Sequence, residues 1–211
     1  MERKYNKFSW LSADGYITSA DLSDDGKNIA VGTLNSKNSY YSEFFSFNIY
    51  DKKPLFRKRY DGQMLMGSTI LDNGSFLALF DNQYKVLSNK GDEQKSYTYP
   101  TDYTIKSFDF EKDGHLAILF SDNESSHILA TNVTGFQTAP VNLSVTGEVT
   151  SFCLNKNSIL AATSDKIYNI GWNGSIKKTE TLDEYNIDHL VCLSNQTMLA
   201  VRKTSVSIIP Y

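Results

Sequence analysis

Hydrophobic and polar residues alternate along most of the chain, in short runs that end at polar turns. A period of two residues is typical of β-strands that bury one face, whereas an amphipathic helix repeats every 3.6 residues. No stretch of the chain shows a convincing helical period. The sequence therefore predicts an all-β protein.

One unit recurs five times: an alternating run, a tight polar turn, and a second apolar run that contains Ala. In the first copy Ala20-Asp21-Leu22 leads through Asp24-Asp25-Gly26 to Ile29-Ala30-Val31. The five turns are centred on Gly26, Gly74, Gly114, Asn157 and Gln196. They recur at a period of about 42 residues, which indicates a repeat architecture.

Each copy continues with a second candidate hairpin, so the unit has four short antiparallel strands. The second turns are Asp51-Lys52-Lys53, Asn89-Lys90-Gly91, Thr134-Gly135 and Asn173-Gly174. Four strands at this period are typical of one blade of a β-propeller. A β-sandwich also has short strands, but it gives no reason for the repeated turn. We therefore predict a β-propeller of about five four-stranded blades, in one domain over residues 1–211.

The repeats also predict which strands lie innermost in the propeller and how the ring closes. The innermost strands are expected at residues 17–23, 65–71, 105–110, 149–154 and 187–193. The last repeat stops at Tyr211 without an outer strand, and Lys4 to Leu11 precedes the first repeat. Pairing of this N-terminal segment with the last strand would close five blades and remove two exposed sheet edges. The same strand count also fits a segment of a larger propeller.

The composition narrows the possible partners. The 211 residues include 21 Lys and Arg against 24 Asp and Glu, a net charge of −3. Nucleic-acid binding normally needs a clustered positive surface, so we expect no nucleic-acid partner. No run approaches the roughly 20 apolar residues of a spanning helix, so we expect no membrane segment in this chain. We expect a monomer.

Acidic and aromatic residues recur in the loops of one predicted rim. Loops between blades share this rim with the loops between the second and third strands of each blade. The predicted rim residues are Asp14, Tyr16, Tyr40, Tyr41, Asp61, Asp81, Asp102, Tyr103, Asp122, Asp165, Asp183 and Tyr185. Tyr offers a large contact area with a polar tip, which favours a ligand-binding rim. Alternatively, Asp starts the turns and Tyr packs on the blade below.

Equivalent positions of the innermost strands carry Asp21, Thr69, Asp109, Cys153 and Cys192. The two carboxylates either act as acid and base around a central cavity or accept hydrogen bonds from a neighbouring blade. The two cysteines hold the same register in adjacent innermost strands. Their side chains should therefore point in the same direction around the propeller axis and not toward each other. We therefore expect two buried thiols and no disulfide.

The sequence predicts no metal and no cofactor. His115, His127 and His189 form no zinc-binding set, and Asp24-Asp25-Gly26 lacks the ligand spacing of a calcium loop. Nucleophile, Walker and dinucleotide-binding motifs are absent as well.

The stretch from Ile17 to Val31 is similar to the blade motif of WD40-like and quinoprotein-like bacterial propellers. Thr204 to Pro210 resembles a last inner hairpin of the same kind. More narrowly, residues 10–211 resemble the C-terminal part of an uncharacterised bacterial family with a cytoplasmic tail, one membrane helix and an extracytoplasmic propeller. The resemblance implies a location at the cell surface, and without it a cytoplasmic location is expected. It supplies no catalytic residues.

These observations favour a non-enzymatic scaffold that presents the rim to a protein or peptide, at the bacterial cell envelope if the resemblance holds. The first alternative is a lectin-like five-bladed propeller that binds carbohydrate. The second is a glycosidase-type enzyme that uses Asp21, Asp109 and a third carboxylate.

Overall fold

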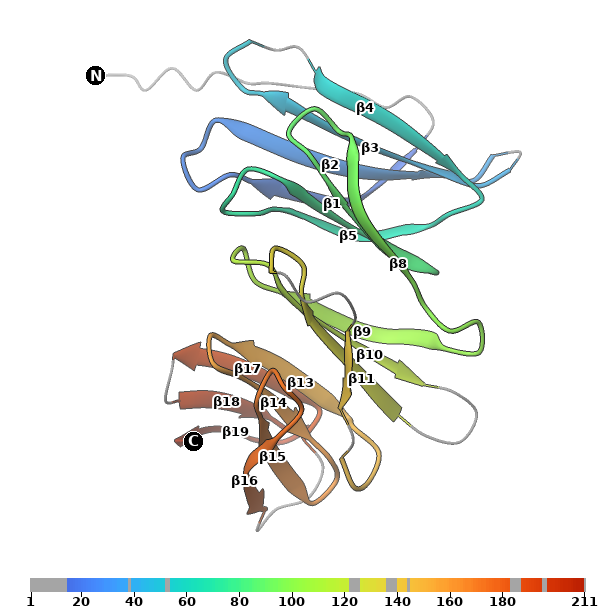
Figure 1. Ribbon diagram of the computed structural model, residues 1–211. Coiled ribbons are helices and arrows are strands. Elements are labelled where there is room, and N and C mark those ends of the chain that lie inside the picture. The colour runs from blue at the N-terminus through green and yellow to red at the C-terminus, as the bar shows by residue number, and fades with distance from the viewer. Residues whose placement is uncertain are drawn as a thin grey trace. The chain divides into compact units, whose positions relative to one another are not determined.

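The computed structural model describes residues 15–37, 39–51, 54–121, 126–135, 140–143, 145–182, 187–194 and 197–210. Every helix or strand within these ranges is a β-strand, which confirms the predicted all-β class (Figure 1). None of the described residues forms a helix that could cross a bilayer. The chain divides into two compact units, with the boundary between Tyr99 and Pro100.

The first unit contains two four-stranded antiparallel sheets with their strands in chain order. The first sheet consists of β1 (Tyr16–Leu22), β2 (Asn28–Asn35), β3 (Tyr41–Asn48) and β4 (Pro54–Asp61). The second consists of β5 (Leu65–Ile70), β6 (Phe76–Phe80), β7 (Gln83–Leu87) and β8 (Glu93–Thr98).

The second unit contains three antiparallel sheets with the same consecutive strand order. The third sheet consists of β9 (Thr104–Phe110), β10 (His115–Ser121), β11 (Ser126–Asn132) and β12 (Val141–Leu143). The fourth consists of β13 (Ser151–Asn155), β14 (Ser158–Ala162), β15 (Lys166–Ile170) and β16 (Ile176–Thr181). The fifth has three described strands, β17 (His189–Ser194), β18 (Thr197–Val201) and β19 (Val206–Pro210).

The five sheets correspond to the five predicted repeats, so the prediction of propeller blades is confirmed. The predicted innermost strands coincide with β1, β5, β9, β13 and β17, and each of them is the edge strand of its sheet. The predicted ring closure depends on Lys4 to Leu11, which lies outside the described residues.

Neighbouring sheets within each unit bury their apolar faces against one another. In the first unit Phe44, Phe56 and Phe76 pack edge to face, with ring centroids 5.1 to 6.0 Å apart. All three side chains are buried, and burial of a large aromatic side chain contributes on the order of 2–3 kcal/mol. In the second unit Ala117 and Ile128 of the third sheet pack against the apolar side chains of the fourth sheet.

The turns between the first two strands of the first three sheets follow the predicted chemistry. Gly74 has a φ of +77° and Gly114 a φ of +101°, a region that side chains with a Cβ rarely adopt. A Cβ at Gly114 would also lie 2.6 Å from the side chain of Thr134. The repeated glycine that revealed the period is therefore required by the backbone of the turn.

Hydrogen bonds from the innermost strands connect each sheet to the next one within a unit. Asp21 Oδ2 accepts hydrogen bonds from the backbone N of Ile70 and from Thr69 Oγ1, both at 2.8 Å. At the equivalent position of the third sheet, Asp109 Oδ2 accepts one from the backbone N of Leu154 at 3.3 Å. Both carboxylates therefore accept hydrogen bonds from a neighbouring blade, which is one of the two roles expected from the sequence.

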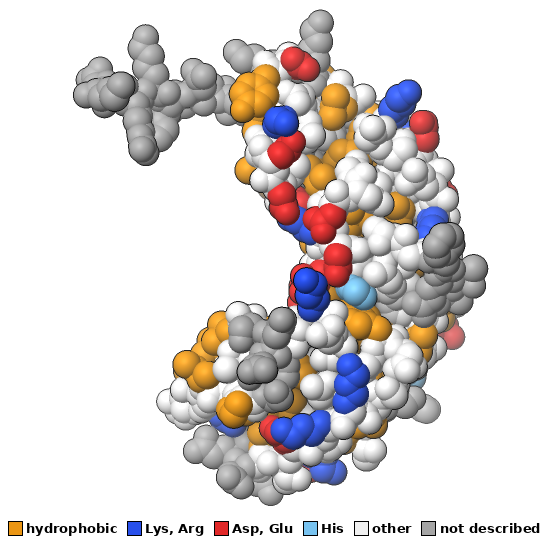
Figure 2. All heavy atoms as spheres, turned by 60° about the vertical axis from the view of Figure 1, so that its left-hand side comes forward, with side chains coloured by type: hydrophobic (Ala, Val, Ile, Leu, Met, Phe, Trp, Pro, Cys, Tyr) orange, Lys and Arg blue, Asp and Glu red, His pale blue; other side chains and the backbone are white. Residues whose placement is uncertain are grey.

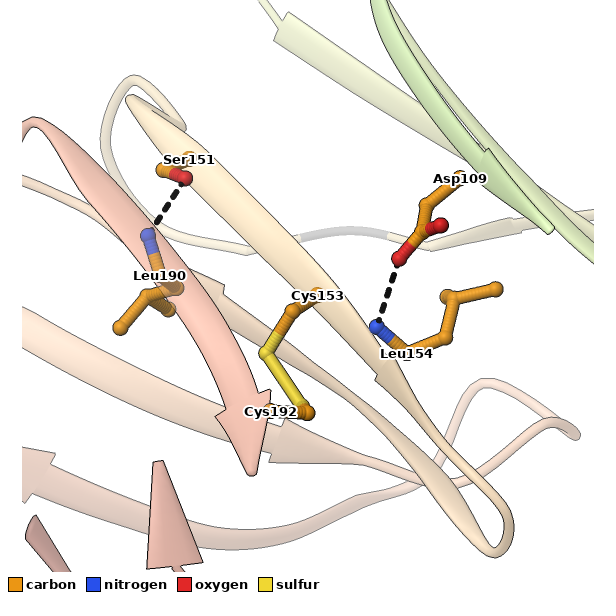
Figure 3. The surroundings of a disulfide bond; sticks show 6 residues. All are labelled: Asp109, Ser151, Cys153, Leu154, Leu190 and Cys192. Carbon is orange, nitrogen blue, oxygen red and sulfur yellow. Dashed lines mark hydrogen bonds between the residues drawn. A yellow bond between two sulfur atoms is a disulfide. The ribbon is translucent and has the colours of Figure 1, made fainter. Parts of the chain in front are cut away.

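A disulfide joins Cys153 of β13 to Cys192 of β17, so the prediction of two separate thiols is wrong (Figure 3). Their Cα atoms lie 5.7 Å apart, a typical separation for a disulfide. Beside it, Ser151 Oγ accepts a hydrogen bond of 2.9 Å from the backbone N of Leu190. The fourth and fifth sheets are thus connected both covalently and by hydrogen bonds.

A β-bulge in β17 explains why the cysteine prediction failed. The pairing of β17 with β18 shifts between Cys192 and Ser194, which leaves Leu193 as an extra residue. The pairing of β13 with β14 has no such shift around Cys153. A shift of one residue turns the side chains before it to the opposite face of the strand. Cys192 therefore faces β13, where the unshifted register would have pointed it away.

We expect the substitution Asp21→Ala to destabilise the protein by about 1–2 kcal/mol, because it leaves a backbone donor of β5 without its charged acceptor. Asp21→Asn keeps one acceptor oxygen and should cost less. Denaturant unfolding measures the difference. The control is Asp72→Ala, which removes an exposed carboxylate from the β5–β6 turn. An equal decrease in the free energy of unfolding for the substitutions at positions 21 and 72 would show that the hydrogen bonds of Asp21 between the sheets do not stabilise the protein.

Loss of the disulfide in the double variant Cys153→Ala/Cys192→Ala should lower the free energy of unfolding by about 2–4 kcal/mol, because 39 residues separate the two cysteines. Unfolding of the parent protein with and without dithiothreitol should show a similar loss. The double variant should be insensitive to the reductant. A parent protein that carries two thiols reactive to maleimide under native oxidising conditions would contradict the disulfide.

Candidate functional site

Several predicted rim residues of the first unit lie at one end of its two sheets. Tyr16 begins β1 and pairs with Leu34 near the end of β2, while Tyr41 begins β3 and pairs with Asp61 at the end of β4. The backbone N of Gly62 donates a hydrogen bond of 3.0 Å to the carbonyl of Tyr40, which joins the two kinds of loop. The predicted grouping of these loops therefore holds within this unit.

This end of the first unit exposes aromatic and apolar surface. Tyr16 is 74% exposed, Tyr40 is 48% exposed and Met64 is 37% exposed. Figure 2 shows hydrophobic side chains at the surface of the molecule among acidic and basic ones. We call Tyr16, Tyr40, Tyr41, Asp61 and Met64 the tyrosine rim.

Arg59 holds two members of the tyrosine rim in place. Its guanidinium carbon lies 3.6 Å from the centroid of the Tyr41 ring, and its Nε donates a hydrogen bond of 2.7 Å to Asp61 Oδ1. A guanidinium over an aromatic face is an attractive cation–π contact. The sequence interpretation missed Arg59, although the alternation of Arg57, Arg59 and Asp61 along β4 places all three on one face.

Hydrogen bonds fix the loop from the first sheet to the second. Ser42 is fully buried, and its Oγ donates to the carbonyl of Gln63 and accepts from the backbone N of Leu65, both at 2.8 Å. Asp81 Oδ1 accepts a hydrogen bond of 3.1 Å from the backbone N of Met64. Asp81 therefore stabilises the loop through one of its carboxylate oxygens.

The predicted rim residues of the second unit take part in local contacts. The Tyr103 ring stacks on His127, with centroids 4.8 Å apart, and Asp102 accepts a weak hydrogen bond from Thr101. Asp165 Oδ1 accepts a hydrogen bond of 3.2 Å from Thr163 Oγ1 within its own turn. The other predicted rim residues, Asp14, Asp122, Asp183 and Tyr185, lie outside the described residues.

A cavity of about 820 Å³ lies within the second unit, along the innermost strands of its three sheets. Its walls come from residues 106–109 of β9, residues 148–154 in and before β13, and residues 188–192 in and before β17. The disulfide and the Asp109 carboxylate belong to these walls (Figure 3). The sequence interpretation located the three strands and considered a central cavity beside them, but it did not identify which residues line it.

The walls of this cavity carry more negative than positive charge. Asp109, Glu111, Glu148 and Asp188 contribute carboxylates, while Lys106 contributes the ammonium group. His189 also lines the cavity. Serine, threonine and phenylalanine side chains also line the cavity, so its walls include hydrogen-bonding and apolar groups as well as charged ones.

Two carboxyl groups at the cavity have raised pKa values. Burial raises the pKa of Asp109, while hydrogen bonds from the backbone N of Leu154 and Phe110 act in the opposite direction. Asp109 as a residue is exposed to solvent, and the rise in its pKa comes from partial loss of water around the carboxyl group. Burial also raises the pKa of Glu111, and the nearby charges of Asp113 and Asp109 add to the shift.

The three histidines lie in separate environments of the second unit. His115 Nδ1 lies 2.9 Å from Asp113 Oδ1, and its ring stacks on Trp172 with centroids 4.2 Å apart. His127 stacks on Tyr103, and His189 lines the cavity. Across the described part of the chain, no three His, Cys, Asp or Glu residues form a group that could hold a metal ion.

Comparison with known sequences identifies the family. The sequence profile of a family of unknown function, DUF5711, matches residues 3–210, nearly the whole chain. The chain belongs to the DUF5711 family. No curated protein matches it in sequence.

Solved structures support the propeller fold of this DUF5711 protein. It is similar to KlHsv2 with loop 6CD replaced by a Gly-Ser linker, with a TM-score of 0.61 and 8% identity over 93% of this chain. It is also similar to the WD40 β-propeller domain of Doa1, with a TM-score of 0.52 and 11% identity over 92% of this chain. The chain covers 63% of the first of these structures and 77% of the second.

A protein of unknown function from Bacteroides caccae is similar as well, with a TM-score of 0.51 and 15% identity. That likeness covers 87% of the DUF5711 chain and 71% of the Bacteroides protein. At such low identity the three structures show the fold alone. The WD40-like part of the sequence resemblance is thereby supported.

The raised pKa of Asp109 predicts a pH-dependent contribution to stability. The folded state binds a proton on the Asp109 carboxyl group more tightly than the unfolded state does. Protonation of Asp109 therefore stabilises the fold fully below the ordinary pKa of 3.8, and this stabilisation is lost as the pH rises through the pKa of the folded state. The free energy of unfolding of the parent minus that of Asp109→Asn should therefore fall as the pH rises above about 4. Denaturant titrations at several pH values measure this difference, and a difference that rises with pH would contradict the shift.

Proposed function

We propose that this DUF5711 protein is a non-enzymatic binding module, whose tyrosine rim contacts a protein or peptide. The exposure of Tyr16 and Tyr40 at the same end of the first sheet is the observation that carries the proposal. Tyrosine side chains gain much contact area for little loss of conformational entropy, and they are enriched where proteins bind one another.

The ordered parts of the tyrosine rim add to this argument. Arg59 already fixes the Tyr41 ring and the Asp61 carboxylate, so a partner would not need to order them. Met64, in the loop between the first and second sheets, adds a flexible and partly exposed apolar side chain, which suits a surface that adapts to its ligand. The proposed surface thus combines fixed polar groups with exposed apolar ones.

A non-enzymatic role agrees with the positions of the inner-strand carboxylates. Asp21 and Asp109 each accept hydrogen bonds from a neighbouring strand, which uses the groups that a glycosidase would need as acid and base. We therefore place the glycosidase-type alternative behind a binding role.

We also propose that the propeller functions outside the cytoplasm. Stable structural disulfides are typical of oxidising compartments and rare in the cytosol. The link between Cys153 and Cys192 therefore supports the extracytoplasmic location that the bacterial family resemblance implies.

A random peptide library displayed on phage tests the rim. Peptides selected on the parent protein should bind the double variant Tyr16→Ala/Tyr40→Ala at least 10-fold more weakly, because two aromatic contacts are lost. The matched control is Tyr50→Ala, since Tyr50 is 74% exposed in the same unit but lies in the turn after β3, at the opposite end of the sheet.

Peptides that lose as much affinity to Tyr50→Ala as to the double variant, or a selection that enriches nothing, would overturn the rim proposal. A glycan array separates the lectin-like alternative. If the parent protein binds a carbohydrate but no peptide, and the double variant loses that binding, the partner of the rim is a sugar and not a peptide.

A further inference from the structure

We propose that the cavity between β9, β13 and β17 is a second binding site, for a ligand that carries an ammonium or guanidinium group. This site lies in the second unit and is independent of the tyrosine rim. The argument rests on the size of the cavity, the fixed position of its walls and the character of its lining.

The cavity has the size and rigidity of a ligand site. Its volume of about 820 Å³ falls within the roughly 300–1,000 Å³ of typical small-molecule sites. The disulfide fixes β17 against β13, and the hydrogen bond from the backbone N of Leu154 to Asp109 fixes β13 against β9. A cavity with such walls is already formed before a ligand arrives, so little ordering opposes binding.

The charged side chains that line the cavity favour a ligand of positive charge. Glu148 and Asp188 lie on the segments that lead into β13 and β17, while Asp109 and Glu111 lie on the side of β9. Lys106 is the cation among the lining side chains, so carboxylates outnumber it. An excess of one sign of charge in a cleft raises the local concentration of ligands with the opposite charge.

The neutral part of the lining suits the rest of such a ligand. β9, β13 and β17 are edge strands, so each turns one side of its backbone away from its own sheet and can offer hydrogen-bonding groups. Val191 is 45% exposed at the cavity, where it can contact an alkyl chain. The lining therefore fits a cationic group on a short alkyl chain.

Two sources supply this chemistry: a free polyamine and the Lys or Arg side chain of a peptide. Spermidine represents the first source, and the tripeptides acetyl-Gly-Lys-Gly-amide and acetyl-Gly-Arg-Gly-amide represent the second. The same peptide with norleucine in place of Lys keeps the alkyl chain without its charge. Binding of either cationic source, but not of the norleucine peptide, is the expected result.

Isothermal titration of the full chain with these probes tests the site. The double variant Glu148→Gln/Asp188→Asn should weaken binding of the cationic probe by about 10-fold or more, because two opposite charges are removed. Lys106→Gln should tighten binding about 2- to 5-fold, because it removes a repulsive charge. The gain in affinity expected for Lys106→Gln still tests the proposal if the double variant folds poorly.

The matched control is Asp102→Asn/Glu180→Gln, which changes the net charge equally at two residues of the second unit that do not line the cavity. It should change the affinity less than 2-fold. Equal weakening by both double variants would mean attraction to overall charge alone and would overturn the site. Failure of every cationic probe to bind the parent protein would overturn it as well.

Discussion

The connection of each innermost strand to the next sheet is the contact on which both units depend. Apolar faces of two sheets can slide over one another, since hydrophobic burial has little direction. A carboxylate or a disulfide at the innermost strand fixes their alignment. Asp21, Asp109 and Cys153 occupy equivalent positions and each bonds forward along the chain to the following sheet. The same position of the repeat thus aligns neighbouring sheets at three described boundaries, through a hydrogen-bonded carboxylate at two of them and through a disulfide at the third.

The sequence was sufficient to predict the blades, because the period and the turn chemistry are local properties. Gly74 and Gly114 are needed at their turns whatever surrounds them. The cysteine pairing could not be predicted in the same way, because it depends on the bulge at Leu193. No residue type marks a bulge of this kind, and one extra residue reverses the direction of every side chain before it.

For the candidate sites too, the sequence predicted the features that depend on local pairing and missed those that depend on contacts between distant segments. Chain connectivity was enough to place Tyr16 and Tyr41 at one end of a sheet, because pairing follows from the hairpins. It could not separate Asp61, which Arg59 holds at the surface, from Asp81, which stabilises its loop through the backbone of Met64. The cavity depends on how three sheets approach one another, and hairpin patterns carry no such information.

The disulfide has a consequence for the integrity of the second unit. The 39-residue separation between Cys153 and Cys192 includes β14, β15 and β16, the rest of the fourth sheet. A protease that cuts the backbone between the two cysteines would therefore leave two fragments tied together by sulfur. The cleaved chain would keep its fourth and fifth sheets side by side, and the damage would become visible only after reduction.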